Sequence, residues 1–255
     1  MPDIKDYNFM TDSAKIRYPL FAKPIIAILG GFGSGKTEVS VNLAKYLART
    51  GDEPVSIADL DLVNPYFRSR EAIKEMEALG IRVIAPGGAN YFSDLPILLP
   101  EVKGAVESHN GKVILDIGGD SQGTKALGSI SEVFQPNTYD MLMVINSRRP
   151  QTSDVKRCIS TMQRIEVTAG LKFSGLISNS HMIDETDADV IFEGYQLSRE
   201  VSRVSGLPLV FVSAKSDALE KMNLLKFDCP ILPLTRSMLK PWERYNGDNR
   251  NIAGL

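Results

Sequence analysis

The amino-acid sequence predicts an α/β protein with one doubly wound, mostly parallel sheet and helices on both faces of that sheet. Two observations lead to this fold class. Short apolar runs alternate with stretches of helical periodicity along the whole chain. Several of these runs, such as Lys112–Ile117 (KVILDI) and Met141–Ile145 (MLMVI), are apolar at consecutive positions. That pattern is typical of strands that are buried on both faces, as in parallel sheets.

The expected elements follow one another regularly. The first strand is predicted over 24–29 and is followed by a helix over 36–50, in which Val39, Leu43 and Leu47 recur at helical spacing. Further strands are expected at 54–59, 81–85, 112–117, 139–145, 172–178 and 208–213. Further helices are expected at 68–80, 96–109, 122–134, 153–169, 185–205 and 215–223.

No internal repeat or linker interrupts this alternation. We therefore expect one nucleotide-binding domain over residues 23–235, preceded by an N-terminal arm over 1–22 and followed by a C-terminal tail over 236–255.

Composition excludes several classes of protein. The chain has 255 residues, a formal net charge of −2 and a pI of about 5.8, so neither nucleic acid nor an acidic membrane is favoured as its main partner. No apolar run is long enough to span a membrane, and the polar N-terminus does not resemble a secretory signal. Cys158 and Cys229 have no pairing or metal-binding spacing, so we expect reduced thiols and a cytoplasmic location. His109 and His181 are isolated and lack the spacing of a zinc site.

Residues 30–37 read GGFGSGKT and match the phosphate-binding pattern G-x-x-x-x-G-K-[ST] between a predicted strand and a predicted helix. Glycines let successive backbone N–H groups point into one concavity, and the helix N-terminus adds a partial positive charge. Lys36 is expected to reach the β- and γ-phosphates, and the Thr37 hydroxyl to bind Mg²⁺. The nucleotide contacts predicted here are Gly31, Phe32, Gly33, Ser34, Gly35, Lys36, Thr37 and Glu38.

Carboxylates follow the second predicted strand, where Asp59 and Asp61 are one residue apart and lie on the same side of the chain. Because they stand at the carboxyl end of a strand near the phosphate-binding loop, one is expected to hold Mg²⁺ through water and the other to orient the attacking water. The alternative is a solvated loop in which Asp59 or Asp61 caps the next turn.

Two later strand ends also carry polar residues. Asp116 ends an apolar strand and is expected in the Mg²⁺ shell, while Gly119 is expected to place a backbone N–H near the γ-phosphate. The alternative is a helix cap formed by Asp116 or Asp120. Asn179 follows a later strand, and its amide is suited to a purine edge or, alternatively, to loop backbone.

Four segments, GGFGSGKT, ADLDLVNPYFRSRE, LDIGGD and GLISN, together resemble the MinD/ParA/CobQ-type P-loop proteins of the SIMIBI class, which also include the nitrogenase iron protein. The second and third segments also resemble a branch of this group for which only nucleotide binding is described. The resemblance covers roughly residues 24–215. It implies ATP and Mg²⁺ binding and a slow hydrolysis that switches an interaction with a protein partner.

By position, the resemblance implies roles for individual residues. Lys36 and Thr37 match the phosphate and Mg²⁺ residues, Asp61 the water-positioning aspartate, and Asp116 the aspartate of the second switch. Asn179 matches the adenine-reading amide, and Asp59 the strand-end aspartate. On this basis Lys36 and Asp61 are the expected catalytic residues.

One position departs from the family pattern. Many ParA-like proteins carry a second lysine after the first loop glycine, which reaches the nucleotide of a partner subunit, but this chain has Gly31 there. The nucleotide-dependent homodimer implied by the resemblance therefore lacks its usual charge, and Arg68 or Arg70 is the expected substitute. The cysteines that hold the iron protein's cluster have no counterpart in DIGGDSQGTKALG.

The sequence thus predicts a Mg²⁺-dependent ATPase in which residues 61–70 and 117–128 transmit the switch to a protein partner. One alternative is a transferase or ligase of the dethiobiotin-synthetase or cobyrinate-amidating kind, in which Tyr66, Arg68, Arg70 and the glycines at 87–88 bind a carboxylate substrate. A GTPase is ranked lower because an N-K-x-D motif is missing. A scaffold that binds nucleotide without hydrolysing it is the remaining alternative.

Overall fold

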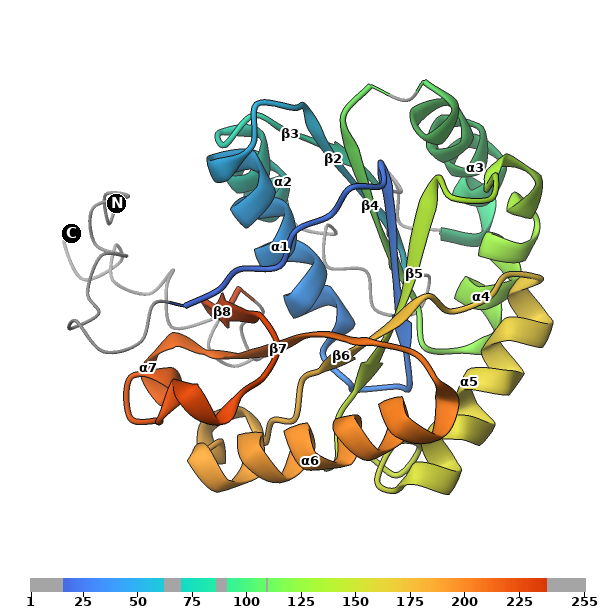
Figure 1. Cartoon of the computed structure of the whole chain (residues 1–255). Coiled ribbons are helices and arrows are strands. Elements are labelled where there is room, and N and C mark those ends of the chain that lie inside the picture. Colours follow the sequence, from blue (N-terminus) through green and yellow to red (C-terminus); the bar gives the residue numbers. More distant parts are fainter. Residues whose placement is uncertain (1–15, 62–69, 86–90, 109, 238–255) are drawn as a thin grey trace, which may run out of the picture.

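The computed structural model describes residues 16–61, 70–85, 91–108 and 110–237. It contains one eight-stranded sheet in the order β3-β2-β4-β1-β5-β6-β7-β8, in which all neighbouring strands are parallel (Figure 1). Helices cover both faces, so the predicted doubly wound α/β fold is confirmed.

The strands are β1 Ile25–Gly30, β2 Val55–Leu60, β3 Ile81–Ile84, β4 Lys112–Ile117, β5 Tyr139–Ile145, β6 Gly175–Ser178, β7 Leu209–Lys215 and β8 Ile231–Leu234. The helices are α1 Lys36–Thr50, α2 Arg70–Glu77, α3 Tyr91–Glu107, α4 Ser121–Gly128, α5 Val155–Ala169, α6 Ala188–Ser205 and α7 Ser216–Leu219. Short 3-10 turns are η3 Ser131–Val133, η4 Ile183–Glu185 and η5 Leu224–Lys226.

The core lies on both faces of the sheet, and β1 shows why its sequence is apolar at every position. Ile26 and Ile28 pack with α1 and α2, whereas Ile25, Ala27 and Leu29 pack with the helices of the opposite face, α3 to α6. All residues of β1 are buried. The continuous apolar run therefore reflects burial on two sides, as parallel sheets require.

The topology places a switch point at the carboxyl end of β1. This strand lies between β4 and β5, and the sheet grows from it in opposite directions, through β4 to β2 and β3 and through β5 to β8. Ligands of doubly wound folds bind at the strand ends where the order reverses in this way. Here that point is occupied by the loop that joins β1 to α1.

Some element boundaries differ from the sequence prediction. β8 was not predicted, because Pro233 lacks the N–H that a central strand needs; β8 lies at the edge of the sheet, where proline is tolerated. The helix predicted over 122–134 ends at Gly128 and continues as η3, and the one predicted over 215–223 forms only α7. The helix predicted over 185–205 begins at Ala188, because the Asp187 side chain caps it by accepting a hydrogen bond from the Val190 N–H at 2.9 Å.

Residues 16–22 contact the domain. The Arg17 carbonyl accepts a hydrogen bond from Ile231 of β8 at 2.8 Å, Tyr18 stacks on Tyr46 of α1 and Phe21 contacts Phe211 of β7. Several predictions fall outside the described residues: the arm over 1–15, the first switch over 62–69 with Tyr66 and Arg68, the glycines at 87–88, His109, and the tail over 238–255. The backbone of Arg70 is described as the start of α2, but its side chain is not.

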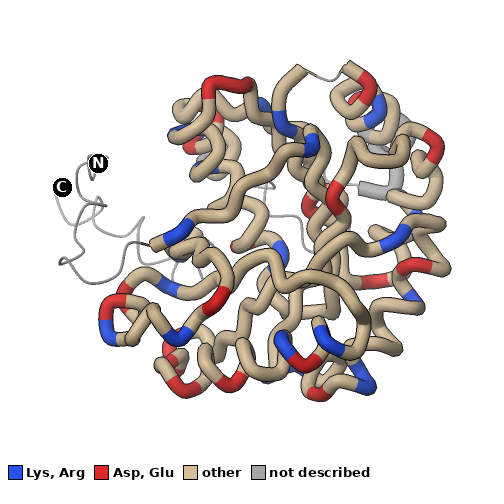
Figure 2. Tube along the Cα trace, viewed as in Figure 1, with Lys and Arg blue, Asp and Glu red and all other residues tan. Residues whose placement is uncertain are grey.

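Acidic and basic residues alternate along the trace, and neither sign gathers on one side of the view (Figure 2). Among the described helices, none combines the length and the apolar character needed to cross a membrane.

We predict that Gly111→Ala destabilises the fold. Gly111 has a φ of 87°, and a Cβ at this position would lie 2.0 Å from the Pro54 carbonyl oxygen. Strain of the left-handed backbone and this overlap together should lower the free energy of unfolding by about 2 kcal/mol or more, measured by urea unfolding.

Gly104→Ala is the matched control. Gly104 lies in the interior of α3, and a Cβ there meets no atom within 4 Å among the described residues, apart from the adjacent backbone of its own helix. Alanine should stabilise this helix by about 0.5–1 kcal/mol. Equal stabilities of the two variants would contradict the conformational argument.

Candidate functional site

The loop between β1 and α1 has the backbone of an anion cradle. Gly33 and Gly35 have φ values of 70° and 85°, which side-chain-bearing residues rarely adopt. Gly35 is the N-cap of α1 and provides no side-chain cap. The first N–H groups of α1 therefore remain available to a bound anion, in line with the pattern that predicted the loop.

Lys36 lies in the first turn of α1 with its side chain folded back over the loop. Its Nζ donates a hydrogen bond to the Gly31 carbonyl at 3.2 Å, and the residue is 6% exposed. Burial lowers the pKa of Lys36, while the negative charges of Asp116, Asp61 and Asp120 partly oppose this effect. A Cβ at Gly119 would lie 2.9 Å from the Lys36 Nζ and also from the Phe32 nitrogen, so Gly119 lies directly against the loop.

Asp116 ends β4 next to β1 and is 1% exposed. Its Oδ1 accepts a hydrogen bond from the Ser40 hydroxyl at 3.2 Å, whereas its buried Oδ2 has no hydrogen-bond partner among the described residues. Burial raises the pKa of Asp116 to about 6 and the charge of Asp61 adds to the rise, while the Thr37 hydroxyl, Lys36 and Ser40 act against it. A buried carboxylate oxygen left without a partner beside a hydroxyl fits a hard divalent cation such as Mg²⁺.

Asp59 and Asp61 join this group. Asp59 is fully buried, is paired with Asp116 in the register of β2 and β4, and accepts a hydrogen bond from the Asp61 N–H at 3.0 Å. A Cβ on Gly118 would lie 3.3 Å from Asp61 Oδ1, so Asp61 lies against the strand end that leads to α4. Within the described part of the chain, no three acidic, histidine or cysteine side chains form a metal site by themselves. Mg²⁺ bound here would share its ligands with phosphate and water.

Asp120 caps a helix, as the alternative interpretation of this segment expected. Its Oδ1 accepts hydrogen bonds from the N–H groups of Gln122 and Gly123 at 2.8 and 2.9 Å, so it is the N-cap of α4. The cap fixes where α4 begins, directly after Gly118 and Gly119.

Asn179 holds the loop from the other side. The residue is 2% exposed, its Nδ2 donates to the Ser34 carbonyl at 2.9 Å, and its Oδ1 accepts from the Ser213 hydroxyl at 3.0 Å. The bond to the Ser34 carbonyl is a bond to loop backbone, as in the alternative interpretation of this residue, whereas the second bond is to a side chain of β7. The contact with a purine stays a prediction.

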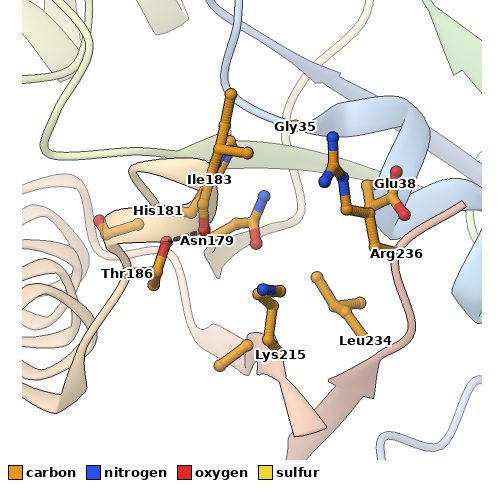
Figure 3. A pocket seen from close by; sticks show the side chains of 11 residues that line it. Gly35, Glu38, Asn179, His181, Ile183, Thr186, Lys215, Leu234 and Arg236 are labelled. Carbon is orange, nitrogen blue, oxygen red and sulfur yellow. Dashed lines mark hydrogen bonds between the residues drawn. The ribbon is translucent and has the colours of Figure 1, made fainter. Parts of the chain in front are cut away.

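A cavity of about 280 Å³ opens beside the loop, on the side of β6, β7 and β8 (Figure 3). Arg236 lies next to Glu38 on one side of it, and His181, Ile183 and Thr186 lie on the opposite side. The lining residues are Gly35, Glu38, Asn179, Ser180, His181, Ile183, Thr186, Ala214, Lys215, Leu234 and Arg236.

Sequence reasoning missed most of this cavity. His181 had been set aside as an isolated histidine, yet its buried Nε2 has no hydrogen-bond partner among the described residues. Burial, together with the positive charge of Arg149, lowers the pKa of His181 to about 4, so the ring is neutral at physiological pH. Lys215, Leu234 and Arg236 depend on the pairing of β7 with β8, which the sequence did not predict.

Residues 235–237 close the cavity against α1. Asn42 exchanges two hydrogen bonds with the Thr235 backbone, at 2.9 and 3.0 Å. The Ser237 N–H donates to Glu38, and Arg236 forms an ion pair with Asp184 at 3.5 Å. Glu38 therefore lines the cavity and also anchors the chain that follows β8.

We predict that Asp116→Asn stabilises the protein in the absence of nucleotide and Mg²⁺. Because the folded-state pKa of about 6 exceeds the ordinary value of 3.8, the folded protein binds a proton that the unfolded chain releases. The free energy of unfolding of the parent therefore falls as the pH rises from about 4 to about 6. Above that window the variant should be more stable by about 1–3 kcal/mol, and below pH 4 the two should be equal, as measured by urea unfolding.

Asp120→Asn is the control, because asparagine caps a helix as well as aspartate does, and its stability should stay within about 0.5 kcal/mol of the parent. A loss of stability in Asp116→Asn above pH 6 would show that the carboxylate is favourably paired without an added cation.

Comparisons with known proteins support the fold. No family model and no curated protein matches the chain. Among solved structures, the cell division protein FtsY from Thermotoga maritima is similar with a TM-score of 0.50 and 19% identity, over 80% of this chain and 67% of that one. Chloroplast FtsY from Physcomitrella patens is similar with a TM-score of 0.50 and 18% identity, over 78% and 60%. The signal recognition particle receptor FtsY from Elizabethkingia anophelis in complex with GDP has a TM-score of 0.48 and 18% identity, over 80% and 59%. The chain thus spans 59–67% of the length of these structures. It shares the α/β fold of FtsY from Thermotoga maritima and from Physcomitrella patens.

Proposed function

We propose that the chain binds ATP with Mg²⁺ along the carboxyl edge of the sheet, hydrolyses it slowly, and uses the hydrolysis to switch an interaction with a protein partner. The observation that carries this proposal is the placement of two features on opposite sides of the phosphate-binding loop. The cavity lies over β6, β7 and β8, and the unpartnered oxygen of Asp116 lies at the end of β4.

This arrangement fits an elongated ligand. With the base in the cavity beside Gly35, the phosphates follow the N–H groups of the loop and of α1. The terminal phosphate then points toward Lys36, Asp61 and Asp116, whose charges interact with one another. A ligand without phosphates would use only the cavity, and an inorganic phosphate only the loop.

The proposed chemistry is attack of water on the γ-phosphate. The loop N–H groups and Lys36 stabilise the negative charge that spreads over the phosphate oxygens. Asp61 orients the water, since phosphoryl transfer requires position and charge more than a strong base. Thr37 and Asp116 would hold Mg²⁺, with Asp59 reaching it through water, and the bound ion would neutralise phosphate charge.

The proposed switch lies in residues 117–128. Gly119 lies within contact distance of Lys36 and Phe32, and α4 begins two residues later at a rigid Asp120 cap. If hydrolysis changes the contact between Gly119 and the γ-phosphate, the resulting shift of the backbone is therefore transmitted to α4 over two residues. Residues 61–70 are the second part of the proposed switch. The sequence resemblance implies two kinds of partner, a second copy of the chain and an unidentified protein, and the proposal takes the unidentified protein.

We propose ATP over GTP because residues 179–182 read Asn-Ser-His-Met, so that Met182 stands where an N-K-x-D motif has its carboxylate. The proposal includes a cytoplasmic location, in keeping with two free cysteines that are both buried. It does not extend to carboxylate activation, because most residues predicted to bind such a substrate lie outside the described part of the chain.

Lys36→Ala should weaken ATP binding about 10- to 100-fold, because the variant loses charge-assisted hydrogen bonds to phosphate. Titration calorimetry with ATP, GTP and ADP in the presence of Mg²⁺ measures this effect. Arg49→Ala, on the exposed end of the same helix, is the control and should bind like the parent. A parent protein without affinity for any nucleotide would refute the proposal, and tighter binding of GTP than of ATP would reverse the choice of base.

Asp61→Ala should leave the dissociation constant of Mg²⁺-ATP within about threefold of the parent and lower the rate of phosphate release about 100-fold or more. The reason is that Asp61 positions water and makes no bond that the bound nucleotide needs. Single-turnover hydrolysis with enzyme in excess separates the two quantities. Unchanged turnover would remove Asp61 from the catalytic group and favour a nucleotide-binding scaffold.

A further inference from the structure

The segment that joins β5 to α5 lies against the phosphate-binding loop. Arg149 Nε donates a hydrogen bond to the Gly33 carbonyl at 2.8 Å. A Cβ on Gly33 would lie 3.1 Å from this Nε and 3.7 Å from Cζ, so the guanidinium group lies on the glycine itself. Two residues later, Gln151 Oε1 accepts a hydrogen bond from the Phe32 N–H at 3.4 Å.

The backbone that carries Arg149 is held firmly. Asn146 and Thr152 are fully buried, and the Thr152 hydroxyl donates to the Asn146 carbonyl at 2.7 Å. The same carbonyl accepts from the Arg149 N–H at 3.1 Å, and the Thr152 N–H donates to the Arg149 carbonyl at 3.0 Å. Only the side chain of Arg149 is therefore free to move toward a ligand.

Position 31 cannot supply a positive charge in this chain. A Cβ on Gly31 would lie 2.9 Å from Gln151 Oε1 and 3.1 Å from its Cβ, so a lysine there would have to displace Gln151. Arg149 already brings a cation to the same face of the loop, from within the same chain.

The charge of Arg149 is also uncompensated. No carboxylate forms an ion pair with it among the described residues, whereas its neighbour Arg148 is paired with Glu193. The positive charge of Arg149 contributes to the lowered pKa of His181, which lines the cavity. Arg149 thus lies against the loop at Gly33, and its charge acts on a residue of the cavity wall.

We propose that Arg149 binds the phosphate chain of the nucleotide in cis and replaces the charge that Gly31 lacks. This inference rests on the proposed nucleotide-binding function. With a ligand bound, the guanidinium group exchanges its bond to the Gly33 carbonyl for bonds to phosphate oxygens, or makes both together through its several N–H groups. One copy of the chain then contains every cation that the phosphates need.

The first test compares Arg149→Ala with Arg148→Ala by calorimetric titration of ATP, ADP and AMP with Mg²⁺. Arg149→Ala should weaken ATP binding about 10- to 100-fold and reduce its dependence on salt, while Arg148→Ala should bind within about twofold of the parent. Binding by the parent but equal binding by both variants would overturn the inference alone. No binding by the parent would overturn the proposed function as well.

A second variant separates charge from loop support. Arg149→Gln keeps an N–H donor for the Gly33 carbonyl but removes the positive charge. It should fold with the stability of the parent and still show most of the loss in ATP affinity. If Arg149→Gln binds ATP like the parent, Arg149 only braces the loop and the inference is wrong.

Oligomeric state gives an independent readout. A single copy that provides all phosphate contacts should have a turnover per chain that does not change over a 100-fold range of protein concentration, and should show one-chain mass by light scattering with ATP. Turnover that rises with concentration, together with a two-chain mass, would show that a second copy supplies the charge and would overturn the inference.

Discussion

The burial of Lys36 and Asp116 at the ends of two adjacent structural elements is the constraint on which the site depends. Charged groups taken out of water are costly unless they are paired or bonded. Lys36 is opposed by three aspartates, yet burial still lowers its pKa, and burial still raises the pKa of Asp116 despite the nearby lysine. Neither charge is fully compensated within the described chain. The proposed triphosphate and divalent cation would supply the opposite charges that are missing.

Three side chains hold the phosphate-binding loop by its carbonyl groups. Lys36 bonds the carbonyl of Gly31, Arg149 that of Gly33, and Asn179 that of Ser34. They come from α1, from the segment after β5 and from the segment after β6, so the loop is tied to the helix that follows it and to the half of the sheet that begins at β5. These bonds restrict the conformation of the loop, in which the positive φ values of Gly33 and Gly35 allow N–H groups to turn toward one concavity. The anion cradle is thus prepared by contacts made before any ligand binds.

Much of the fold and part of the site could be predicted from local sequence. The strand–loop–helix around Lys36 has a fixed spacing, and the polar ends of apolar strands at Asp59 and Asp116 lie at the same edge of any parallel sheet. Contacts between distant segments could not be predicted. Arg149 meets Gly33 across 116 positions, and Gln151 meets Phe32 across 119, with no periodicity in the intervening loop to indicate either. The strand β8 was not predicted for another reason. Pro233 argues against a strand unless the strand is known to lie at an edge of the sheet.

The strand that was not predicted, β8, forms part of the cavity wall. β8 brings Leu234 and Arg236 to the cavity wall, and the bonds of Asn42 to Thr235 hold this wall against α1. On its other side β8 receives support from Arg17, ahead of β1. The same helix that begins at the phosphate-binding loop therefore also anchors the wall of the cavity, nearly two turns further along. Phosphate groups at the start of α1 and a base in the cavity would contact one rigid body, so the two halves of the ligand reinforce each other's placement without any rearrangement of the sheet.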